Sequence, residues 1–229
     1  MRGRCHSMRN REARRFGLIV FDWDGTLADS TSIIAASIQA ACCDIGQPVP
    51  DDAAARYVIG LGFTAAARHV APALAPERYA MLSAAYRDHY MAREAAIPLF
   101  AGARELLDEL AEAGYLLAVA TGKSRAGLDH ALTRNGLQGM FHATRCADEG
   151  MPKPHPEMLL SLMTLLGTTP ERTLMIGDTT HDLDLARNAG TCALAVAYGA
   201  HERMSLAQCN PVATVDSIGT LRQWLRANA

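Results

Sequence analysis

The sequence predicts an α/β fold with a doubly wound, Rossmann-like parallel sheet as its core and a small all-helical cap domain inserted after the first strand. Two observations support this prediction. Short apolar runs alternate with segments of helical periodicity along most of the chain, which is typical of a parallel sheet covered by helices on both faces. One interval of about 95 residues, between the first apolar run and Leu116, shows helical patterns but no clear strand.

Apolar runs of strand length occur at five places, and we expect each to be a buried strand of the sheet. They are Leu18–Phe21, Leu116–Ala120, Thr173–Ile176, Cys192–Val196 and the weaker Val212–Val215. Helical patterns follow most of them, and two of these patterns end at a glycine, Gly114 and Gly167, a residue common at helix C-termini.

The long interval without a strand predicts a separate helical unit. Residues 28–46 and 76–94 have the pattern of two long helices. We therefore predict an α/β core formed by residues 16–27 and 99–229. The cap would comprise residues 28–98, with hinges near Leu27 and Pro98.

Composition excludes several classes of protein. No apolar run approaches the ~18 residues that would span a membrane, so we expect no membrane contact. The cysteine spacing suggests neither a zinc site nor a disulfide framework, which favours reduced thiols and a cytoplasmic protein. The cysteines are Cys5, Cys42, Cys43, Cys146, Cys192 and Cys209.

The first fifteen residues differ in charge from the rest of the chain. They contain six arginines and one glutamate, whereas the remainder carries a net negative charge. Such an arm could be a transit peptide or a nucleic-acid arm, but its low complexity favours a basic, disordered extension of residues 1–15. We expect no nucleic-acid partner, and the sequence leaves both a monomer and a homodimer open.

Two acidic residues follow the first predicted strand directly. In extended chain, residues two apart point to the same side, so Asp22 and Asp24 would project together. At a separation of ~4 Å and an effective dielectric constant of ~20, their repulsion is about 4 kcal/mol. A divalent cation such as Mg²⁺, a shared proton or a solvated turn would each relieve it.

Further polar residues follow other predicted strands. Thr121 and Gly122 come just after the second, where a hydroxyl and free backbone N–H groups can bind phosphoryl oxygens. Asp178 ends the third strand, and Asp182 follows in the first turn of a helix. Because open α/β sheets bind ligands at the carboxyl ends of their strands, these residues predict one site.

A lysine between two prolines adds a positive charge to this set. Lys153 lies in the segment MPKPHP, where the proline rings fix the backbone. The chain contains only two lysines against twenty arginines. A lysine in a stiff loop therefore suggests a requirement for a compact ammonium rather than a planar guanidinium.

Taken in order, these motifs resemble those of the haloacid dehalogenase superfamily of phosphohydrolases. The first motif of that family, D-x-D-G-T, matches Asp22 to Thr26, and its fourth, G-D-x-x-x-D, matches Gly177 to Asp182. The second and third motifs match Thr121 and Lys153. The resemblance covers residues 17 to about 220, and the position of the helical insert is similar to the phosphoglycolate phosphatase and β-phosphoglucomutase branch.

The resemblance implies a mechanism and a cofactor. Asp22 would be the nucleophile that forms an aspartyl-phosphate, and Asp24 the general acid and then the general base. Mg²⁺ would be held by the Asp22 side chain, the Asp24 backbone carbonyl and the Asp178 side chain, with Asp182 in support.

The implied substrate is a small phosphorylated metabolite, phosphoglycolate-like or a sugar phosphate. Thr121, Gly122 and Lys153 would bind its phosphoryl group. Arg56 or Arg68, in the expected cap, could bind a substrate carboxylate, although a solvated helix face is the alternative for each.

Two other functions stay open on the sequence. A sugar phosphomutase would share the fold and the carboxylate pair, although the segment GDTTHD is more typical of a phosphatase. A non-catalytic binding module of the same fold would be expected to have lost at least one of these acidic residues or Lys153, and all are present.

Overall fold

The computed structural model describes residues 14–229 of the protein. Most of the predicted basic extension, residues 1–15, therefore lies outside the described residues. In the part of the chain that is described, no helix is long and apolar enough to cross a lipid bilayer.

A parallel sheet of six strands forms the centre of the described chain, in the order β3-β2-β1-β4-β5-β6. The predicted α/β class with a doubly wound parallel sheet is thus confirmed. The strands are β1 (Leu18–Phe21), β2 (Leu116–Thr121), β3 (Ala143–Cys146), β4 (Thr173–Gly177), β5 (Cys192–Val196) and β6 (Ala213–Val215).

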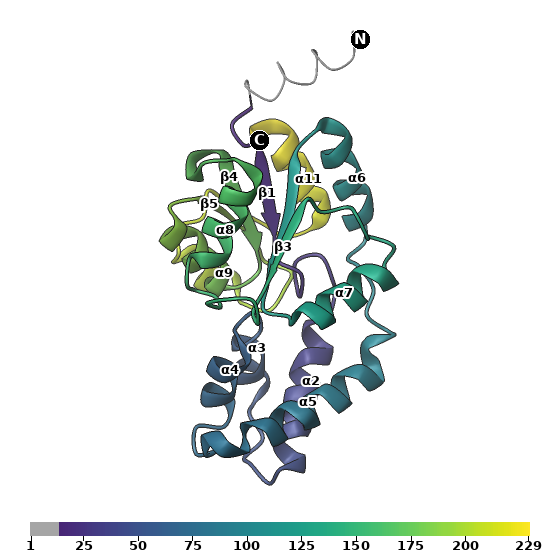
Figure 1. The fold of residues 1–229 in the computed structure, drawn as a ribbon, viewed down its shortest axis with the longest axis vertical. Helices are drawn as coiled ribbons and strands as arrows, with labels where there is room; N and C mark the ends of the chain where they lie inside the picture. Colours follow the sequence, from purple (N-terminus) through teal and green to yellow (C-terminus); the bar gives the residue numbers. More distant parts are fainter. Residues whose placement is uncertain (1–13) are drawn as a thin grey trace.

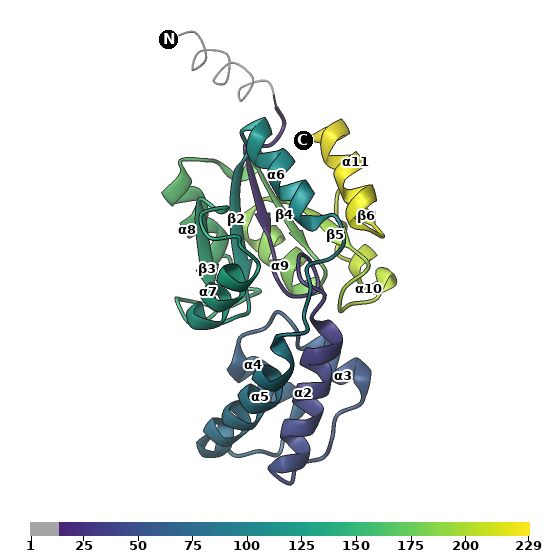
Figure 2. The ribbon, with the colours of Figure 1, turned by 90° about the vertical axis from the view of Figure 1, so that its right-hand side faces the viewer.

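Helices cover both faces of this sheet because its side chains alternate in direction (Figures 1 and 2). Ile19 and Phe21 of β1 belong to one apolar cluster, with side chains from α6, α7 and α11. Leu18 and Val20 belong to another, with side chains from α8 and α9. These helices are α6 (Ala103–Ala113), α7 (Arg125–Arg134), α8 (Glu157–Leu166), α9 (Thr180–Ala189) and α11 (Ile218–Asn228). The short α10 (Arg203–Ala207) packs in a smaller cluster through Leu206.

The interval between β1 and α6 is helical and lies beyond the carboxyl ends of the strands (Figure 1). Its elements are α2 (Thr31–Asp44), α3 (Asp52–Tyr57), α4 (Phe63–Val70), a 3-10 turn (Pro76–Arg78) and α5 (Tyr79–Glu94). We call residues 28–98 the cap. Its helices share an apolar cluster of their own, which includes Val58, Ala67 and Leu82. Ile34, Ile59, Tyr90 and Ile97 instead join the main cluster of the sheet.

Two neighbouring segments connect the cap to the sheet. Ala28 and Leu99 form an antiparallel bridge, the Asp29 N–H donates to the Pro98 carbonyl, and the Phe100 N–H donates to the Leu27 carbonyl. The chain therefore leaves the core and returns to it at one place.

Candidate active site

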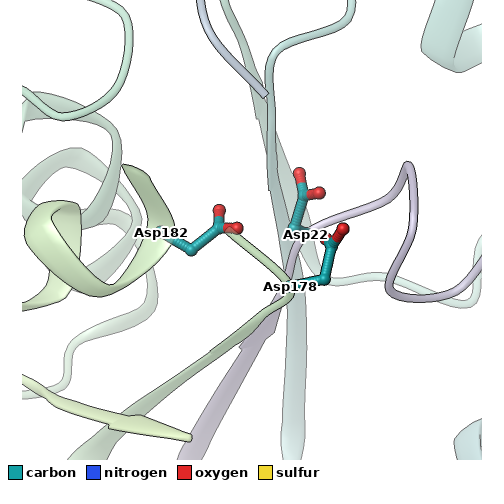
Figure 3. A group of neighbouring side chains, drawn as sticks. All are labelled: Asp22, Asp178 and Asp182. Carbon is teal, nitrogen blue, oxygen red and sulfur yellow. The ribbon is translucent and has the colours of Figure 1, made fainter. Parts of the chain in front are cut away.

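Three buried aspartates meet where β1 and β4 end. Asp22 directly follows β1, Asp178 directly follows β4, and Asp182 lies in the first turn of α9. One carboxylate oxygen from each residue lies within 4.8 Å of the others (Figure 3). β1 and β4 are hydrogen-bonded neighbours in the sheet, which explains why residues 156 positions apart in the chain come together.

Glycines make room for the Asp178 carboxylate. A Cβ atom at Gly25 would lie 2.1 Å from Asp178 Oδ2, and one at Gly199 would lie 2.2 Å from the same atom. Asp178 Oδ1 accepts a hydrogen bond of 2.8 Å from Thr26 Oγ1, and Oδ2 accepts one of 2.7 Å from the Ala200 N–H. The carboxylate is therefore fixed in one orientation by the loops that surround it.

Lys153 joins two of the aspartates. Its Nζ donates to Asp22 Oδ1 and to Asp182 Oδ1, each at 2.6 Å, and its side chain is completely buried. Burial alone would lower the pKa of Lys153, but the facing Asp182 and Asp22 carboxylates raise it above its ordinary value. Lys153 thus carries a full positive charge inside the site.

Asp182 has both of its oxygens engaged by the protein. Oδ1 accepts from Lys153, while Oδ2 accepts from the N–H and the hydroxyl of Thr179 in a capping box at the start of α9. Its position is consequently set by the helix terminus. Because Oδ1 is paired with the Lys153 ammonium, whereas the Asp178 oxygens accept from neutral donors, Asp182 is better suited to hold Lys153 than to bind a cation directly.

Asp22 is the least satisfied of the three carboxylates. Its Oδ2 is buried and has no hydrogen-bond partner among the described residues. Burial raises the pKa of Asp22 to about 7, against the opposing charge of Lys153 and with the help of Asp182 and Asp24. Burial, followed by the charges of Asp22 and Asp182, raises the pKa of Asp178 well above its usual range. This excess of buried negative charge fits a divalent cation between Asp22 and Asp178.

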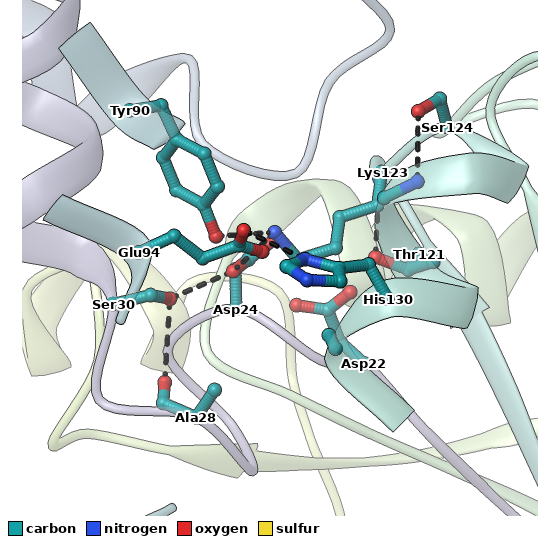
Figure 4. Close-up of polar contacts among 12 residues, drawn as sticks. Asp22, Asp24, Ala28, Ser30, Tyr90, Glu94, Thr121, Lys123, Ser124 and His130 are labelled. Carbon is teal, nitrogen blue, oxygen red and sulfur yellow. Dashed lines mark hydrogen bonds and ion pairs between the residues drawn. The ribbon is translucent and has the colours of Figure 1, made fainter. Parts of the chain in front are cut away.

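Asp24 lies beside this cluster and has different partners (Figure 4). Its Oδ1 accepts a hydrogen bond of 2.8 Å from Ser30 Oγ and faces the Lys123 ammonium at 3.2 Å. Lys123 in turn donates to the Tyr90 hydroxyl at 2.8 Å, and its Nζ lies 4.6 Å from the centre of that ring. Burial opposes the charge of Lys123, but Asp24, Tyr90 and Tyr86 raise its pKa.

Lys123 is a site residue that the sequence analysis did not predict. Both lysines of the chain lie in the site. The scarcity of lysine, which indicated a specific role for Lys153, applies equally to Lys123. Its position two residues after Thr121 places it at the end of β2. From there its side chain reaches both Asp24 and the cap.

Thr121 and Gly122 lie where β2 ends, as their place in the sequence predicts. Thr121 is buried, and its Oγ1 accepts a hydrogen bond of 3.2 Å from the Lys123 N–H. Gly122 lines a cavity and closely approaches the cap, because a Cβ atom there would lie only 2.6 Å from the Gly60 carbonyl oxygen. A side chain at Gly122 would therefore separate the two loops.

A cavity of about 690 Å³ is lined by Asp22 and Asp24 of the core and by residues of the cap. Residues 58–61 of the cap loop are among them. Arg56 and Arg68 are not among the lining residues. Arg56 is paired with Asp52 at 2.7 Å and donates to Thr31 and Ser32, and Arg68 is exposed. Their predicted role in binding a substrate carboxylate is not supported by this geometry.

Several polar contacts hold the cap against the core. The Tyr57 carbonyl of the cap accepts hydrogen bonds from His181 Nε2 at 2.7 Å and from His201 Nε2 at 3.1 Å. On the other side of the cavity, Glu94 of the cap contacts His130 Nδ1 at 2.8 Å (Figure 4). The histidines, which the sequence analysis did not place in the site, thus contribute to the contact between cap and core.

Comparison with known proteins places these motifs in a family. The model of the haloacid dehalogenase-like hydrolases matches residues 19–196. "Probable phosphatase IndB" of Dickeya dadantii (strain 3937) is 38% identical over 206 residues, which cover 87% of this chain and 89% of that protein. The phosphoglycolate phosphatase of Mannheimia succiniciproducens is 28% identical over 208 residues, 86% of this chain and 92% of that protein.

A solved structure shows the same architecture. The crystal structure of a predicted phosphoglycolate phosphatase from Haemophilus somnus 129PT aligns with a TM-score of 0.81 and 25% identity, and the alignment covers 92% of this chain and 98% of that one. The family model covers residues 19–196, more than half of the chain, and IndB is 38% identical over 87% of it. The chain therefore belongs to the haloacid dehalogenase-like hydrolases and is similar to the phosphatases of that family.

Proposed function

We propose that the protein is a Mg²⁺-dependent phosphatase that hydrolyses a phosphate monoester of a small metabolite through an aspartyl-phosphate on Asp22. The observation that carries this proposal is the state of the Asp22 carboxylate. One oxygen is held by Lys153, and the other is buried without a partner among the described residues. An anchored carboxylate with an available oxygen is suited to attack phosphorus.

The metal would be held by Asp22 and Asp178, with the Asp24 backbone carbonyl as the resemblance implies. Asp182 would support the site through Lys153, since its Oδ1 is paired with that ammonium at 2.6 Å and its Oδ2 accepts from Thr179. When bound, Mg²⁺ supplies positive charge close to the phosphoryl oxygens, which three aspartates would otherwise repel.

The reaction uses Asp22 and Asp24 in turn. An oxygen of Asp22 attacks phosphorus, the bond from phosphorus to the alcohol oxygen breaks, and Asp24 donates a proton to the departing oxygen. Water then attacks the phosphorus of the aspartyl-phosphate while Asp24 takes up its proton. Inorganic phosphate leaves and the Asp22 carboxylate is restored.

Lys153 and the end of β2 bind the phosphoryl group in this scheme. The Lys153 ammonium already lies 2.6 Å from Asp22, so it also lies close to an attached phosphoryl group. The Thr121 hydroxyl and the Gly122 N–H would supply hydrogen bonds to its oxygens. These donors are in position before the substrate arrives. Unlike water molecules, they need not reorient to stabilise the transition state.

A phosphate-release assay over phosphorylated metabolites and a generic aryl phosphate, with and without Mg²⁺, tests the proposal. We expect release that requires Mg²⁺, stops with EDTA and is lost in Asp22→Asn. Release that survives full chelation would refute the metal assignment. Isomerisation of a sugar phosphate without net phosphate release would identify a mutase instead.

A further inference from the structure

We infer that the substrate is a phosphate monoester whose alcohol portion is extended, apolar and larger than glycolate, and that the cap binds it. This inference rests on the proposed phosphatase function and concerns the same site. It departs from both substrates that the resemblance implies, a phosphoglycolate-like ester and a sugar phosphate. The reasons are the walls of the cavity, its charges and the positions of the arginines.

The walls of the cavity are mostly apolar and come from the cap. Three helices and one loop of the cap contribute them: α2, α4, α5 and residues 58–61. The lining side chains there include Ile34, Ile38, Leu61, Ala66, Val70 and Tyr86. A cavity of about 690 Å³ is within the ~300–1,000 Å³ of sites that enclose drug-sized ligands. A two-carbon acid would leave much of this apolar surface in contact with water.

The charges that line the cavity do not favour a second negative group on the substrate. Four acidic residues line it, Asp22, Asp24, Glu94 and Asp148, against Arg87, Lys123 and a histidine, His130, that already contacts Glu94. Lys123 is already paired with Asp24 at 3.2 Å. Mg²⁺ and the buried Lys153 would offset the phosphoryl charge. An additional carboxylate in the cap portion would meet no comparable excess of positive charge.

The arginines of the cap point to the same conclusion. Arg56 lies outside the cavity lining and is engaged by Asp52, Thr31 and Ser32. Arg68 is exposed and does not line the cavity either. A bidentate contact from arginine is the usual way to recognise a carboxylate. Of the arginines in the described chain, Arg87 is the one that lines the cavity, and it is exposed.

The position of Asp24 sets the direction of the substrate. In the proposed reaction Asp24 protonates the oxygen that leaves phosphorus, and the carbon skeleton attached to that oxygen points away from Asp22. Figure 4 shows Tyr90 of the cap near Asp24, on the side away from Asp22. Ile34 and Tyr90 line the same cavity as Asp22 and Asp24. The apolar cavity is therefore continuous with the reacting atoms.

A series of alkyl phosphates tests the inference, because ethyl, butyl and hexyl phosphate share one leaving-group chemistry and differ only in apolar length. With Mg²⁺ and the full chain, we expect kcat/KM to rise by up to about fourfold per added methylene. Hexyl phosphate should exceed 2-phosphoglycolate. A flat series, with 2-phosphoglycolate preferred, would overturn the inference while leaving the phosphatase proposal intact. No phosphate release from any ester would overturn the phosphatase proposal itself.

Two neighbouring alanines of α4 provide a matched pair of variants. Ala66 lines the cavity, whereas Ala65 is exposed on the same helix. Ala66→Leu should lower kcat/KM for hexyl phosphate by about tenfold. Its effect on ethyl phosphate and on inhibition by inorganic phosphate should be much smaller, and the control Ala65→Leu should leave kcat/KM for every substrate within about twofold. Equal losses on hexyl and ethyl phosphate in Ala66→Leu, with the melting temperature unchanged, would also overturn the inference.

Discussion

At the scale of single residues, the balance of buried charge in the site depends on Lys153. It is fully buried between Asp22 and Asp182, at 2.6 Å from each, in a loop bounded by Pro152 and Pro154. An ion pair of this kind stabilises little overall, but removing one partner leaves an unpaired buried charge, which is costly. The ammonium must also fit between two carboxylates whose positions are fixed.

The first prediction is that Lys153→Arg lowers kcat/KM by about 100-fold or more, even though it keeps the charge. A guanidinium is larger and planar, and it cannot make the same two contacts in this space. Steady-state kinetics together with circular dichroism, to verify the fold, provide the measurement. Turnover close to that of the wild type would show that a compact ammonium is not required.

A second prediction concerns the cation. If Asp22 and Asp178 hold Mg²⁺, a hundredfold excess over Kd should stabilise the protein by about 2.7 kcal/mol. For a chain of this size the melting temperature should then rise by roughly 5–10 °C. Asp178→Asn should remove this rise.

Asp184→Asn is the matched control for that experiment, since Asp184 lies in the same helix as Asp182 but pairs with Arg187 at the surface. The control should keep the full response to Mg²⁺. A response that persists in Asp178→Asn would place the cation elsewhere.

The site residues also show what could be predicted from the sequence. Four residues were expected at one site because they follow predicted strands or, for the lysine, lie in a stiff loop. The structure brings them together: Asp22, Asp178, Asp182 and Lys153. The positions of arginine side chains could not be predicted in this way. Arg56 pairs with Asp52, one helical turn earlier. The hydrophobic periodicity of a sequence does not show whether an arginine binds such a neighbour or a substrate.

At the scale of elements, one strand was missed for a physical reason. β3 has the sequence ATRC, lies at the edge of the sheet and is only partly buried in its first three residues. The apolar runs that identify central strands are therefore absent from it. The other five strands were predicted within one residue at each end, because each is rich in apolar residues.

The contact between two loops yields a third prediction. Gly122 does not have a positive φ, so alanine is compatible with its backbone, but the added Cβ would lie 2.6 Å from the Gly60 carbonyl oxygen of the cap. Gly122→Ala should therefore push the cap away without damaging the core. We expect kcat/KM to fall by roughly tenfold, an effect of a small displacement on catalysis. The melting temperature should change little.

Gly219→Ala is a suitable control, since its Cβ would make an ordinary contact of 3.6 Å with Ser217 Oγ. Because alanine retains the N–H at position 122, inhibition by inorganic phosphate should change less than turnover. Unchanged kcat/KM in Gly122→Ala would mean that the cap tolerates the displacement or need not approach so closely.

At the scale of the whole molecule, the cap and the sheet have partly separate cores. The cap cluster comprises Ala41, Cys42, Val58, Ala67, Val70, Ala71, Leu74 and Leu82. Few cap residues enter the main cluster, and the polar contacts with the core are local. Such an arrangement favours opening of the cap without unfolding of the sheet.

The fourth prediction follows from this arrangement and is measured by hydrogen exchange of the intact protein. Amides of α2 and α5 should exchange faster than those of β1 and β4. Addition of Mg²⁺ with orthovanadate, a mimic of the transferring phosphoryl group, should slow exchange in the cap loop of residues 58–62 by about tenfold or more. Equal exchange rates in the cap and the sheet, with no response to the ligands, would contradict a mobile cap.

The pairing of the two connecting segments determines how the cap could be replaced. Ala28 and Leu99 form an antiparallel bridge, so the cap is attached to the core in the way that a turn is attached to the two strands of a hairpin. A turn of about two to five residues could close the same pair. We therefore expect that a different cap grafted at this junction would leave the strands that carry the chemistry in place, provided that it covers the apolar surface now contacted by Ile34, Ile59, Tyr90 and Ile97.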